Sequence, residues 1–559
     1  MNTLEGVLSG QKIAYFSMEI GLLSEIPTYS GGLGILAGDT IRSAADLNIP
    51  LVGVSLLSNG GYFRQSLDSE GRQTEHRVDW DPSKFMSLLP PEVKVKLGGT
   101  RDVKVRAWVY NCKSLTGNCV PVLFLDTNVE GNHEEDRRIC DYLYGGDSSY
   151  RFKQEIVLGI GGVRMLEALG FNIRKYHMNE GHSSLLALEL LKRNGTNVPE
   201  VRERCIFTTH TPVEAGHDKF DYGLVETLIP EREDLKLLKR LGGEDKLNMS
   251  LLALNLSAYI NGVTKRHSLI SQQIFPGYRI QAITNGVHSY TWTSPFFREL
   301  YDRYLPGWAN EPELLVRVDG IPDDEIWAAH RSAKKYLIDY VNQLTGAGLD
   351  YETLTLGFSR RMTEYKRPTF IFSDLERLRK INEKGKLQLI FAGKAHPKDE
   401  AGKAFIRDIY GYAEELKSDM KIVFLENYDM DLAARMVAGV DLWLNTPQRP
   451  FEASGTSGMK AAHNGVINFS VLDGWWIEGW IEGVNGWAIG PEPSESLSEE
   501  ECRAYELNDL YNKLSYIIVP TYYKRKDEWF KLMNNSISMI AYYFNSHRMM
   551  RRYVTQAYL

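Results

Sequence analysis

The chain has 559 residues, of which 43% are hydrophobic and 25% are charged, a balance typical of a globular protein with more than one domain. Its formal net charge of −7 argues against a general nucleic-acid binder. No uninterrupted apolar run is long enough to span a bilayer, and the five scattered cysteines predict reduced thiols. We therefore expect a cytoplasmic protein with neither a membrane nor a nucleic acid as partner.

Short apolar runs alternate with amphipathic stretches along most of the chain. The apolar runs are 13–16, 51–56, 122–125, 206–208, 354–357, 387–392, 422–425 and 466–471. The main helical patterns between them are 35–47, 323–344, 400–416 and 431–438. Because buried parallel strands read as continuous apolar segments, this alternation predicts an α/β fold with doubly wound sheets.

The α/β units have a similar density in the two halves of the chain, which predicts two Rossmann-like domains. We expect an N-terminal domain at 1–285 and a C-terminal domain at 286–529, with a helical segment at about 530–559 packing back on the first. Ligands of such folds bind at the carboxyl ends of the strands. The cleft between the domains is therefore the expected site.

The first candidate motif is Tyr-Ser-Gly-Gly-Leu-Gly at 29–34, directly before the predicted helix 35–47. Glycines before a helix let backbone N–H groups approach an anion, and the helix dipole favours negative charge there. The motif is weak alone, since a tight turn that binds nothing has the same composition.

The second motif surrounds His210, where the apolar run 206–208 gives way to a loop. A lone histidine is more often structural, but its place at a strand end favours a catalytic or binding role. His217 follows across a proline-containing loop, and this spacing is not a metal signature. We therefore predict no metal.

The third motif, Arg-Arg-Met-Thr-Glu-Tyr-Lys-Arg at 360–367, places four cations after the predicted strand 354–357. Arginine binds phosphate as a fork and lysine binds it as a point charge. A solvated basic surface has the same composition, and it is the commoner explanation of a charge run alone. The position at a strand end favours a phosphate site.

The fourth motif is Pro-Phe-Glu-Ala-Ser-Gly-Thr-Ser-Gly-Met-Lys at 450–460, where a loop rich in small residues leads into a helix. Such a loop can offer several backbone donors to a phosphate or a sugar. Lys460 falls in the helical segment, where a partly desolvated amine could form a Schiff base. An exposed lysine at a helix start is the alternative, and the pattern alone favours it.

Together these segments resemble the α-glucan phosphorylase family, whose members act on glycogen, starch and maltodextrin. EASGTSGMK at 452–460 is similar to the family's cofactor-lysine segment, and RRMTEYKR at 360–367 is similar to its phosphate-site segment. Further segments match in the same order: GGLG at 31–34, TTHTPVEA at 208–215, ITNGVHSYTW at 283–292, GKAHP at 393–397 and FLENYDMDLA at 424–433. Ser457-Gly458 departs from the Gly-Asn common in the glycogen enzymes, and Pro450-Phe451 resembles a short, divergent prokaryotic branch.

The resemblance implies a GT-B architecture and pyridoxal 5'-phosphate as the cofactor, held covalently by Lys460. It implies a catalytic set of Lys460, Arg361, Lys366 and His210. The residues around the cofactor would be Lys460, Trp292, Tyr365, Arg360, Lys366, Gly32 and Thr456. The residues that bind the terminal glucose and the substrate phosphate would be Gly31, Gly32, Leu33, Asn285, His210, Arg361, Glu452, Ser454 and Gly455.

The implied reaction is reversible phosphorolysis of the non-reducing terminal glucose of an α-1,4-glucan. Inorganic phosphate would release α-D-glucose 1-phosphate with retention of configuration. The cofactor's phosphate would be the acid–base group, since a phosphate with a second pKa of about 6 exchanges protons near neutrality. The partners would be maltodextrin, glycogen or starch, and the family also allows a homodimer.

Two other functions compete with this one. The first is a glucan glycosyltransferase that uses a nucleotide sugar, as glycogen synthase does, and the second is a cofactor-free glucan-binding protein. Lys460 in its segment favours the phosphorylase, because neither alternative needs an amine there. Trp475, Trp476 and Trp480 could stack on sugars or belong to the core.

Overall fold

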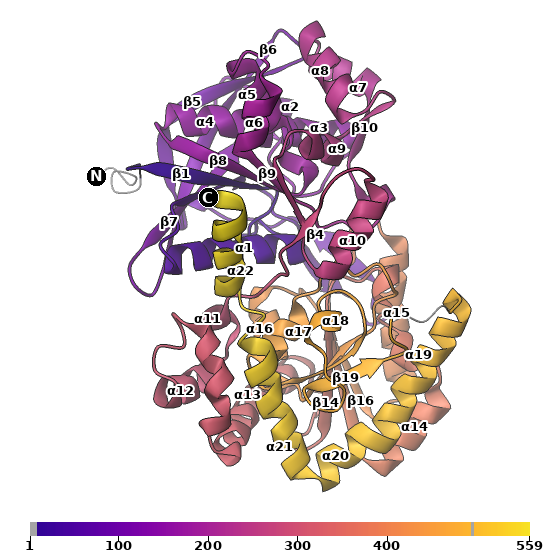
Figure 1. The fold of residues 1–559 in the computed structure, drawn as a ribbon. Helices are drawn as coiled ribbons and strands as arrows, with labels where there is room; N and C mark the ends of the chain where they lie inside the picture. Colours follow the sequence, from indigo (N-terminus) through magenta and orange to yellow (C-terminus); the bar gives the residue numbers. More distant parts are fainter. Residues whose placement is uncertain (1–7, 494–496) are drawn as a thin grey trace. The chain divides into compact units, whose positions relative to one another are not determined.

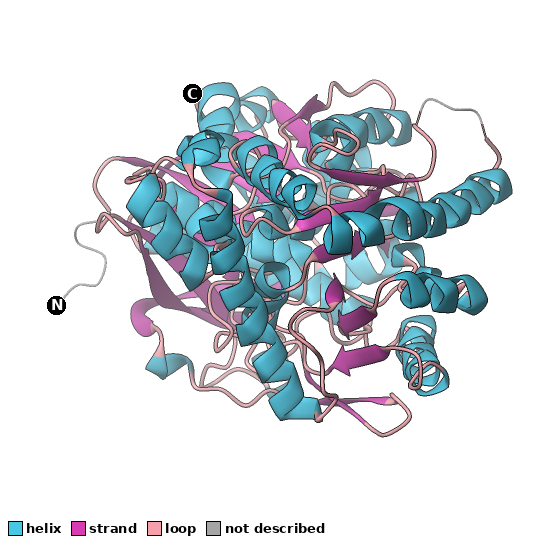
Figure 2. Ribbon diagram, turned by 90° about the horizontal axis from the view of Figure 1, so that it is seen from below, coloured by secondary structure: helices cyan, strands magenta, loops and turns pink. Residues whose placement is uncertain are grey.

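The computed structural model describes residues 8–493 and 497–559, in which strands alternate with helices. Figure 2 distinguishes the helices from the strands by colour. The chain divides into two units (Figure 1). The first comprises Met1–Phe63, Arg77–Thr284 and Met549–Leu559, and the second comprises Arg64–His76 and Asn285–Arg548. Each unit has its own sheet and its own apolar core, so the predicted α/β class is confirmed.

The first unit is built on a nine-stranded sheet of order β13-β12-β9-β8-β1-β2-β7-β6-β5. Neighbouring strands from β13 to β7 are parallel, whereas β7 with β6 and β6 with β5 form antiparallel pairs. Their bounds are β1 (Gln11–Ser17), β2 (Leu51–Leu56), β5 (Ser87–Leu97), β6 (Arg101–Lys113), β7 (Cys119–Asp126), β8 (Asn172–Asn179), β9 (Cys205–Thr208), β12 (Tyr259–Gly262) and β13 (Gln281–Ala282). A separate hairpin of the same unit pairs β10 (Lys219–Asp221) with β11 (Lys246–Asn248).

The antiparallel strands β5 and β6 were not among the predicted apolar runs. In β5 and β6, valines such as Val95, Val103 and Val105 are fully buried and alternate with charged residues. This period of two is typical of antiparallel strands with one solvated face. The long continuous apolar runs occur only in the strands that are buried on both faces.

The second unit contains a six-stranded, wholly parallel sheet of order β16-β15-β14-β17-β18-β19. The bounds are β14 (Leu354–Ser359), β15 (Leu387–Ala392), β16 (Lys421–Leu425), β17 (Leu442–Asn445), β18 (Ile467–Val471) and β19 (Gly486–Ile489). This is the strand order of the Rossmann fold, which reverses between β14 and β17. Ligands of such sheets bind beyond the carboxyl ends of the strands at that reversal. The small hairpin of β3 (Arg64–Leu67) and β4 (Gln73–His76) also belongs to this unit.

Helices connect the strands in both units. In the first they are α1 (Gly32–Asp46), α2 (Glu134–Arg137), α3 (Ser148–Ile156), α4 (Gly162–Ala168), α5 (Leu185–Arg193), α6 (Val198–Arg204), α7 (Tyr222–Leu228), α8 (Arg232–Gly242), α9 (Met249–Asn255) and α10 (Lys265–Ile274). In the second they are α11 (Ser289–Trp292), α12 (Pro295–Tyr304), α13 (Asp323–Thr345), α14 (Leu375–Lys384), α15 (Glu400–Glu415), α16 (Met430–Gly439), α17 (Ser457–Ala462), α18 (Trp476–Gly479), α19 (Glu499–Lys513), α20 (Val519–Lys524) and α21 (Lys526–Asn535). The last helix, α22 (Ser546–Tyr553), crosses the boundary at Met549. No helix among the described residues has the length and apolar composition that a membrane span requires.

Two of the three tryptophans that could have stacked on sugars belong to the core of the second unit. Trp475 and Trp476 are 2% and 0% exposed. Trp475 packs edge-on against Phe544, with ring centroids 4.8 Å apart. Burial of this kind leaves no ring face of either residue for a sugar.

Candidate functional site

The cation cluster of the second unit lies where the parallel sheet reverses its strand order. Arg360 directly follows β14, and Glu452 lies in the loop that follows β17. The Nη2 atom of Arg360 donates to Oε2 of Glu452 at 2.9 Å, and Nζ of Lys366 pairs with the same oxygen. The side chains of both cations are only 10% exposed, so this part of the basic segment is not a solvated surface.

Glu452 is the counter-ion of this cluster and is itself 7% exposed. Burial alone would raise the pKa of its carboxyl group. The ammonium of Lys366 and the guanidinium of Arg360 outweigh burial and hold the Glu452 pKa below its ordinary value. Glu452 is therefore ionised at neutral pH, and it neutralises one of the two positive charges beside it.

Arg360 retains hydrogen-bonding capacity that the protein does not use. Its Nε and Nη1 atoms are buried and have no hydrogen-bond partner among the described residues. A buried donor without an acceptor is costly, and native proteins usually pair such groups with an ordered water or a ligand. These two donors, together with the surplus positive charge, fit an anion such as a phosphate group.

Lys460 is the second element of the site, and it is not the exposed lysine that the pattern alone favoured. It lies in α17, is 7% exposed, and its Nζ atom is 3.7 Å from the centre of the Trp292 ring. Trp292 ends α11 and is 1% exposed. The amide of Asn464 donates to the carbonyl oxygens of both Trp292 (2.8 Å) and Lys460 (3.1 Å), which couples the two backbones.

The start of α17 explains the departure at Ser457-Gly458. The hydroxyl of Ser457 accepts a hydrogen bond from Nε1 of Trp443 at 3.0 Å, so it is engaged inside the unit. A Cβ atom at Gly458 would lie 2.1 Å from Oδ1 of Asn468, which leaves room only for glycine. The packing of α17 against Trp443 and Asn468 therefore accounts for both residues of the pair.

The remaining predicted residues of the second unit are spread around these two elements. Arg361 is exposed, whereas the ring of Tyr365 lies 4.5 Å from Nζ of Lys366. Asn285 is buried, and its Oδ1 atom has no hydrogen-bond partner among the described residues. The turn that leads into α17 contains Ser454, which is buried, together with Gly455 and Thr456, which are partly exposed.

In the first unit the glycine-rich turn encloses a carboxylate of the protein itself. Glu19 is 1% exposed and accepts hydrogen bonds from the amides of Ser30 (2.5 Å) and Gly31 (3.2 Å). The hydroxyl of Tyr144 donates to its other oxygen at 2.9 Å. The amide of Gly31 is thus directed at Glu19, and an anion bound there would compete with this carboxylate. Gly32 and Leu33 begin α1, one residue further along the chain.

His210 lies in the first unit, in the loop after β9, and it is held by the last residue of β8 and the residue that follows it. Its Nε2 atom is 2.6 Å from Oδ1 of Asn179, and its amide donates to Oε2 of Glu180 at 2.7 Å. Burial lowers the pKa of His210 to about 3. Its imidazole is therefore neutral at physiological pH, and it cannot serve as an acid there.

Sequence reasoning missed several residues that shape these sites. Asn179 and Glu180 end an undetected strand, so the rule that ligands gather at strand ends would have found them once β8 was recognised. Glu19 and Asn464 act through partners distant in sequence, and nothing in the sequence pointed to them. Lys394, which lies just after β15, was also missed. Burial lowers the pKa of its amine to about 8, although the Asp429 carboxylate opposes this decrease.

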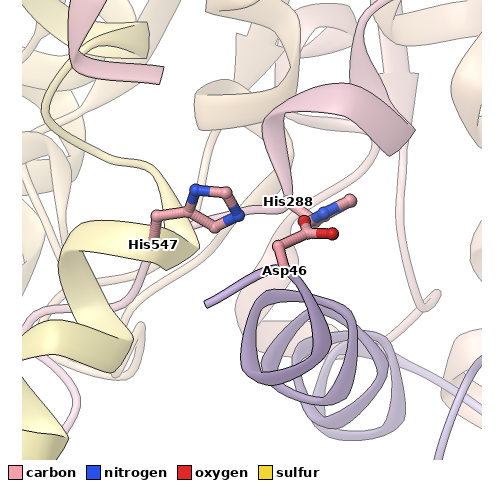
Figure 3. A group of neighbouring side chains, drawn as sticks. All are labelled: Asp46, His288 and His547. Carbon is pink, nitrogen blue, oxygen red and sulfur yellow. The ribbon is translucent and has the colours of Figure 1, made fainter. Parts of the chain in front are cut away.

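Figure 3 shows a pair of histidines in the second unit, with ring centroids 5.9 Å apart. His288 precedes α11, and its Nδ1 atom accepts from the amide of Thr291 at 3.3 Å. Nδ1 of His547, in α22, lies 3.1 Å from the carbonyl oxygen of Asn310. The bond between Thr291 and His288 fixes the backbone that precedes Trp292. Asp46, also labelled in Figure 3, belongs to the first unit.

The fold and the site define the class of the protein. It is a Rossmann-type α/β protein whose buried cations are only partly neutralised by its own carboxylates. The family described as carbohydrate phosphorylase matches residues 201–490. The maltodextrin phosphorylase of Thermococcus litoralis is 41% identical over 98% of this chain and 70% of its own length. The glycogen phosphorylase of Aquifex aeolicus is 36% identical over 98% of this chain and 86% of its own length. An uncharacterized protein of Methanocaldococcus jannaschii is 33% identical over 98% of this chain and 99% of its own length.

The chain belongs to the carbohydrate phosphorylase family. The resemblance drawn from the motifs is confirmed, and the chain is an enzyme of the phosphorylase type.

Proposed function

We propose that this enzyme is an α-1,4-glucan phosphorylase that transfers the non-reducing terminal glucose of its substrate to inorganic phosphate. The product would be α-D-glucose 1-phosphate, with the configuration retained. The carrying observation is the buried Arg360, whose Nε and Nη1 atoms have no partner among the described residues, next to the Lys366–Glu452 ion pair. The names of the relatives, maltodextrin phosphorylase and glycogen phosphorylase, support a glucan as the other substrate.

The residues of the second unit fit pyridoxal 5'-phosphate. The amine of Lys460 is largely buried against the Trp292 ring, and desolvation of this kind suits a lysine that forms a Schiff base. The unpaired donors of Arg360 fit the cofactor's phosphate group. The residues that would hold the cofactor are Lys460, Trp292, Tyr365, Arg360, Lys366, Gly32 and Thr456. When bound, the cofactor would supply a phosphate group that exchanges protons near neutrality, because its second pKa is about 6.

The substrate phosphate would be bound by Arg361 and Lys366. Lys366 is held by Glu452, so its ammonium is already oriented and loses little freedom when an anion arrives. The exposed Arg361 can swing toward a ligand that enters from solvent. Two phosphate groups close together repel each other, and the cations of this segment would offset that repulsion.

The terminal glucose would be bound by residues of both units: Gly31, Gly32, Leu33, Asn285, His210, Glu452, Ser454 and Gly455. The main-chain carbonyl of His210 would face the anomeric carbon, where positive charge develops as the glycosidic bond breaks. A fixed carbonyl dipole stabilises such charge without reorganising during the reaction. The neutral state of the imidazole agrees with this role, because a protonated ring there would oppose the developing positive charge.

We further propose a GT-B architecture with Rossmann-like domains at 1–285 and 286–529. Support for it comes from the family and from the Rossmann strand order of the second unit. A homodimer in the cytoplasm is the assembly and location that the family resemblance and the scattered cysteines suggest. Sedimentation of the purified protein would test the dimer.

The experiment that tests the function is incubation of the enzyme with maltodextrin and phosphate, followed by measurement of glucose 1-phosphate. Wild type should release it, and Lys460→Ala should lose the activity. Lys417→Ala is a matched control, since the side chain of Lys417 is 68% exposed on the same unit. No product from wild type, or equal product from Lys460→Ala, would contradict the proposal.

A further inference from the structure

Glu180 is a buried carboxylate of the first unit that the functions assigned above leave unused. It follows the last residue of β8, is 5% exposed, and has a φ of 72°. Only glycine adopts such a φ readily, so a glutamate here is strained. Its own amide donates to the carbonyl of Thr208 at 2.9 Å, which keeps Glu180 beside the end of β9.

The carboxylate of Glu180 reaches from the end of β8 to the loop that contains His210. Its Oε2 atom accepts from the amide of His210 at 2.7 Å and from the hydroxyl of Thr211 at 3.0 Å. Its Oε1 atom accepts from the amide of Gly181 at 3.1 Å. The two bonds to Oε2 come from either side of the carbonyl group of His210, so they fix the rotation of that peptide plane.

Glu180 binds this loop through neutral donors, while the nearby acids Asp218 and Glu155 share the cation Arg151. Asp218 accepts from Nη2 of Arg151 at 3.0 Å and lies 3.5 Å from Nε2 of His182. The carboxylate of Asp218 is thus neutralised by Arg151 and not by the His210–Thr211 segment. Glu180 has no such ion pair among the described residues, so its carboxylate depends on the His210–Thr211 segment.

We propose that Glu180 is a positioning residue that holds the main-chain carbonyl of His210 in the orientation required for glucosyl transfer. This inference rests on the proposed phosphorylase function. A dipole stabilises a transition state most when its direction is set before the reaction begins. The strain at Glu180 then has a purpose, because a relaxed residue would not direct its carboxylate at the loop.

The competing explanation is that Glu180 merely occupies a tight turn. The variant Glu180→Gly separates the two, because glycine accepts the positive φ without strain and has no carboxylate. A residue needed only for the turn could be replaced by glycine with no loss of activity. A positioning residue could not, even where the variant stays folded.

The test measures kcat and KM with the cofactor-loaded full chain, maltodextrin and phosphate. Glu180→Gly should remain folded at the assay temperature, lower kcat by about 100-fold, and leave KM for maltodextrin within about threefold. Glu180→Gln keeps one acceptor oxygen for the His210 amide, so its kcat should lie between those of wild type and Glu180→Gly. Glu214→Gln is the control in the same loop, where the side chain of Glu214 is 73% exposed, and it should behave as wild type. A kcat of Glu180→Gly within threefold of wild type would overturn the proposal.

Amide hydrogen exchange adds a readout that does not need turnover. In Glu180→Gly the His210 amide should exchange at least about tenfold faster, while the amides inside β9 should keep their wild-type rates. Unchanged exchange at His210 would also overturn the proposal. If wild type releases no glucose 1-phosphate, the phosphorylase function fails, whereas faster exchange in the variant would still show that Glu180 holds the loop.

Discussion

Replacing Glu452 by glutamine tests the buried cation cluster of the second unit. The substitution preserves shape but removes the one negative charge that faces Arg360 and Lys366. All three side chains are at most 10% exposed, so solvent cannot take over the role of the lost carboxylate. Breaking a buried ion pair from one side usually costs about 3–5 kcal/mol, and we expect a loss in this range.

Urea unfolding followed by tryptophan fluorescence would measure this loss relative to wild type. Glu414→Gln is the control, since it breaks an equally close pair with Lys417 that is exposed, and it should have little effect. Added inorganic phosphate should restore more stability to Glu452→Gln than to wild type, because the variant leaves two cations without a counter-ion. A loss below about 1 kcal/mol in the absence of phosphate would refute this account of the cluster.

The stabilising effect of Glu452 also has a definite pH dependence. Its pKa is lower in the folded chain than the ordinary value of 4.5. The contribution of Glu452 to the free energy of unfolding is therefore complete above about pH 4.5, and it is lost as the pH falls through the folded-state pKa. The difference in stability between wild type and Glu452→Gln should shrink in that acidic window.

Three other predictions test separate features. Gly458→Ala should destabilise the fold by about 1–3 kcal/mol or more, because the new Cβ atom would lie 2.1 Å from Asn468. The control Gly411→Ala lies in open space within a helix and should stabilise the fold. Thermal unfolding would compare the two variants. Asn464→Ala should cost about 1–3 kcal/mol in the same assay, because it leaves buried carbonyls without donors. The pKa of Glu180 is raised from 4.5 to about 7, mainly by burial, so stability should fall by up to about 3 kcal/mol as the pH rises between these values. Urea midpoints across that range should show this fall in wild type and not in Glu180→Gln.

The parallel strands were predictable because burial on both faces leaves a continuous apolar signature. All eight apolar runs used for the prediction lie on strands, and helices such as α13 and α16 begin within one residue of their predicted starts. Two kinds of strand escaped detection: short ones such as β17 and β19, and longer ones of mixed composition such as β8. β8 reads Asn-Ile-Arg-Lys-Tyr-His-Met-Asn, and its place in the interior of the sheet is set by its neighbours β1 and β9.

The site was predictable only where chemistry is concentrated in a short segment. The basic run 360–367 and the loop before Lys460 stand out locally, and the structure shows that Arg360, Lys366 and Lys460 are buried or nearly so. Their partners could not be found in the same way. Glu452 meets Lys366 across 86 positions of sequence, and Asn464 meets Trp292 across 172. Such pairings depend on strand order and on the start of α17, which only the folded chain reveals.

The account depends on Lys460 as the residue that holds pyridoxal phosphate. Reducing the purified enzyme with borohydride and mapping its peptides by mass spectrometry tests this most directly. We predict that the peptide containing Lys460 carries the mass of a pyridoxyl phosphate group and that the Lys460→Ala chain carries none. Label on another lysine, or no label on the wild-type chain purified with the cofactor, would contradict the assignment.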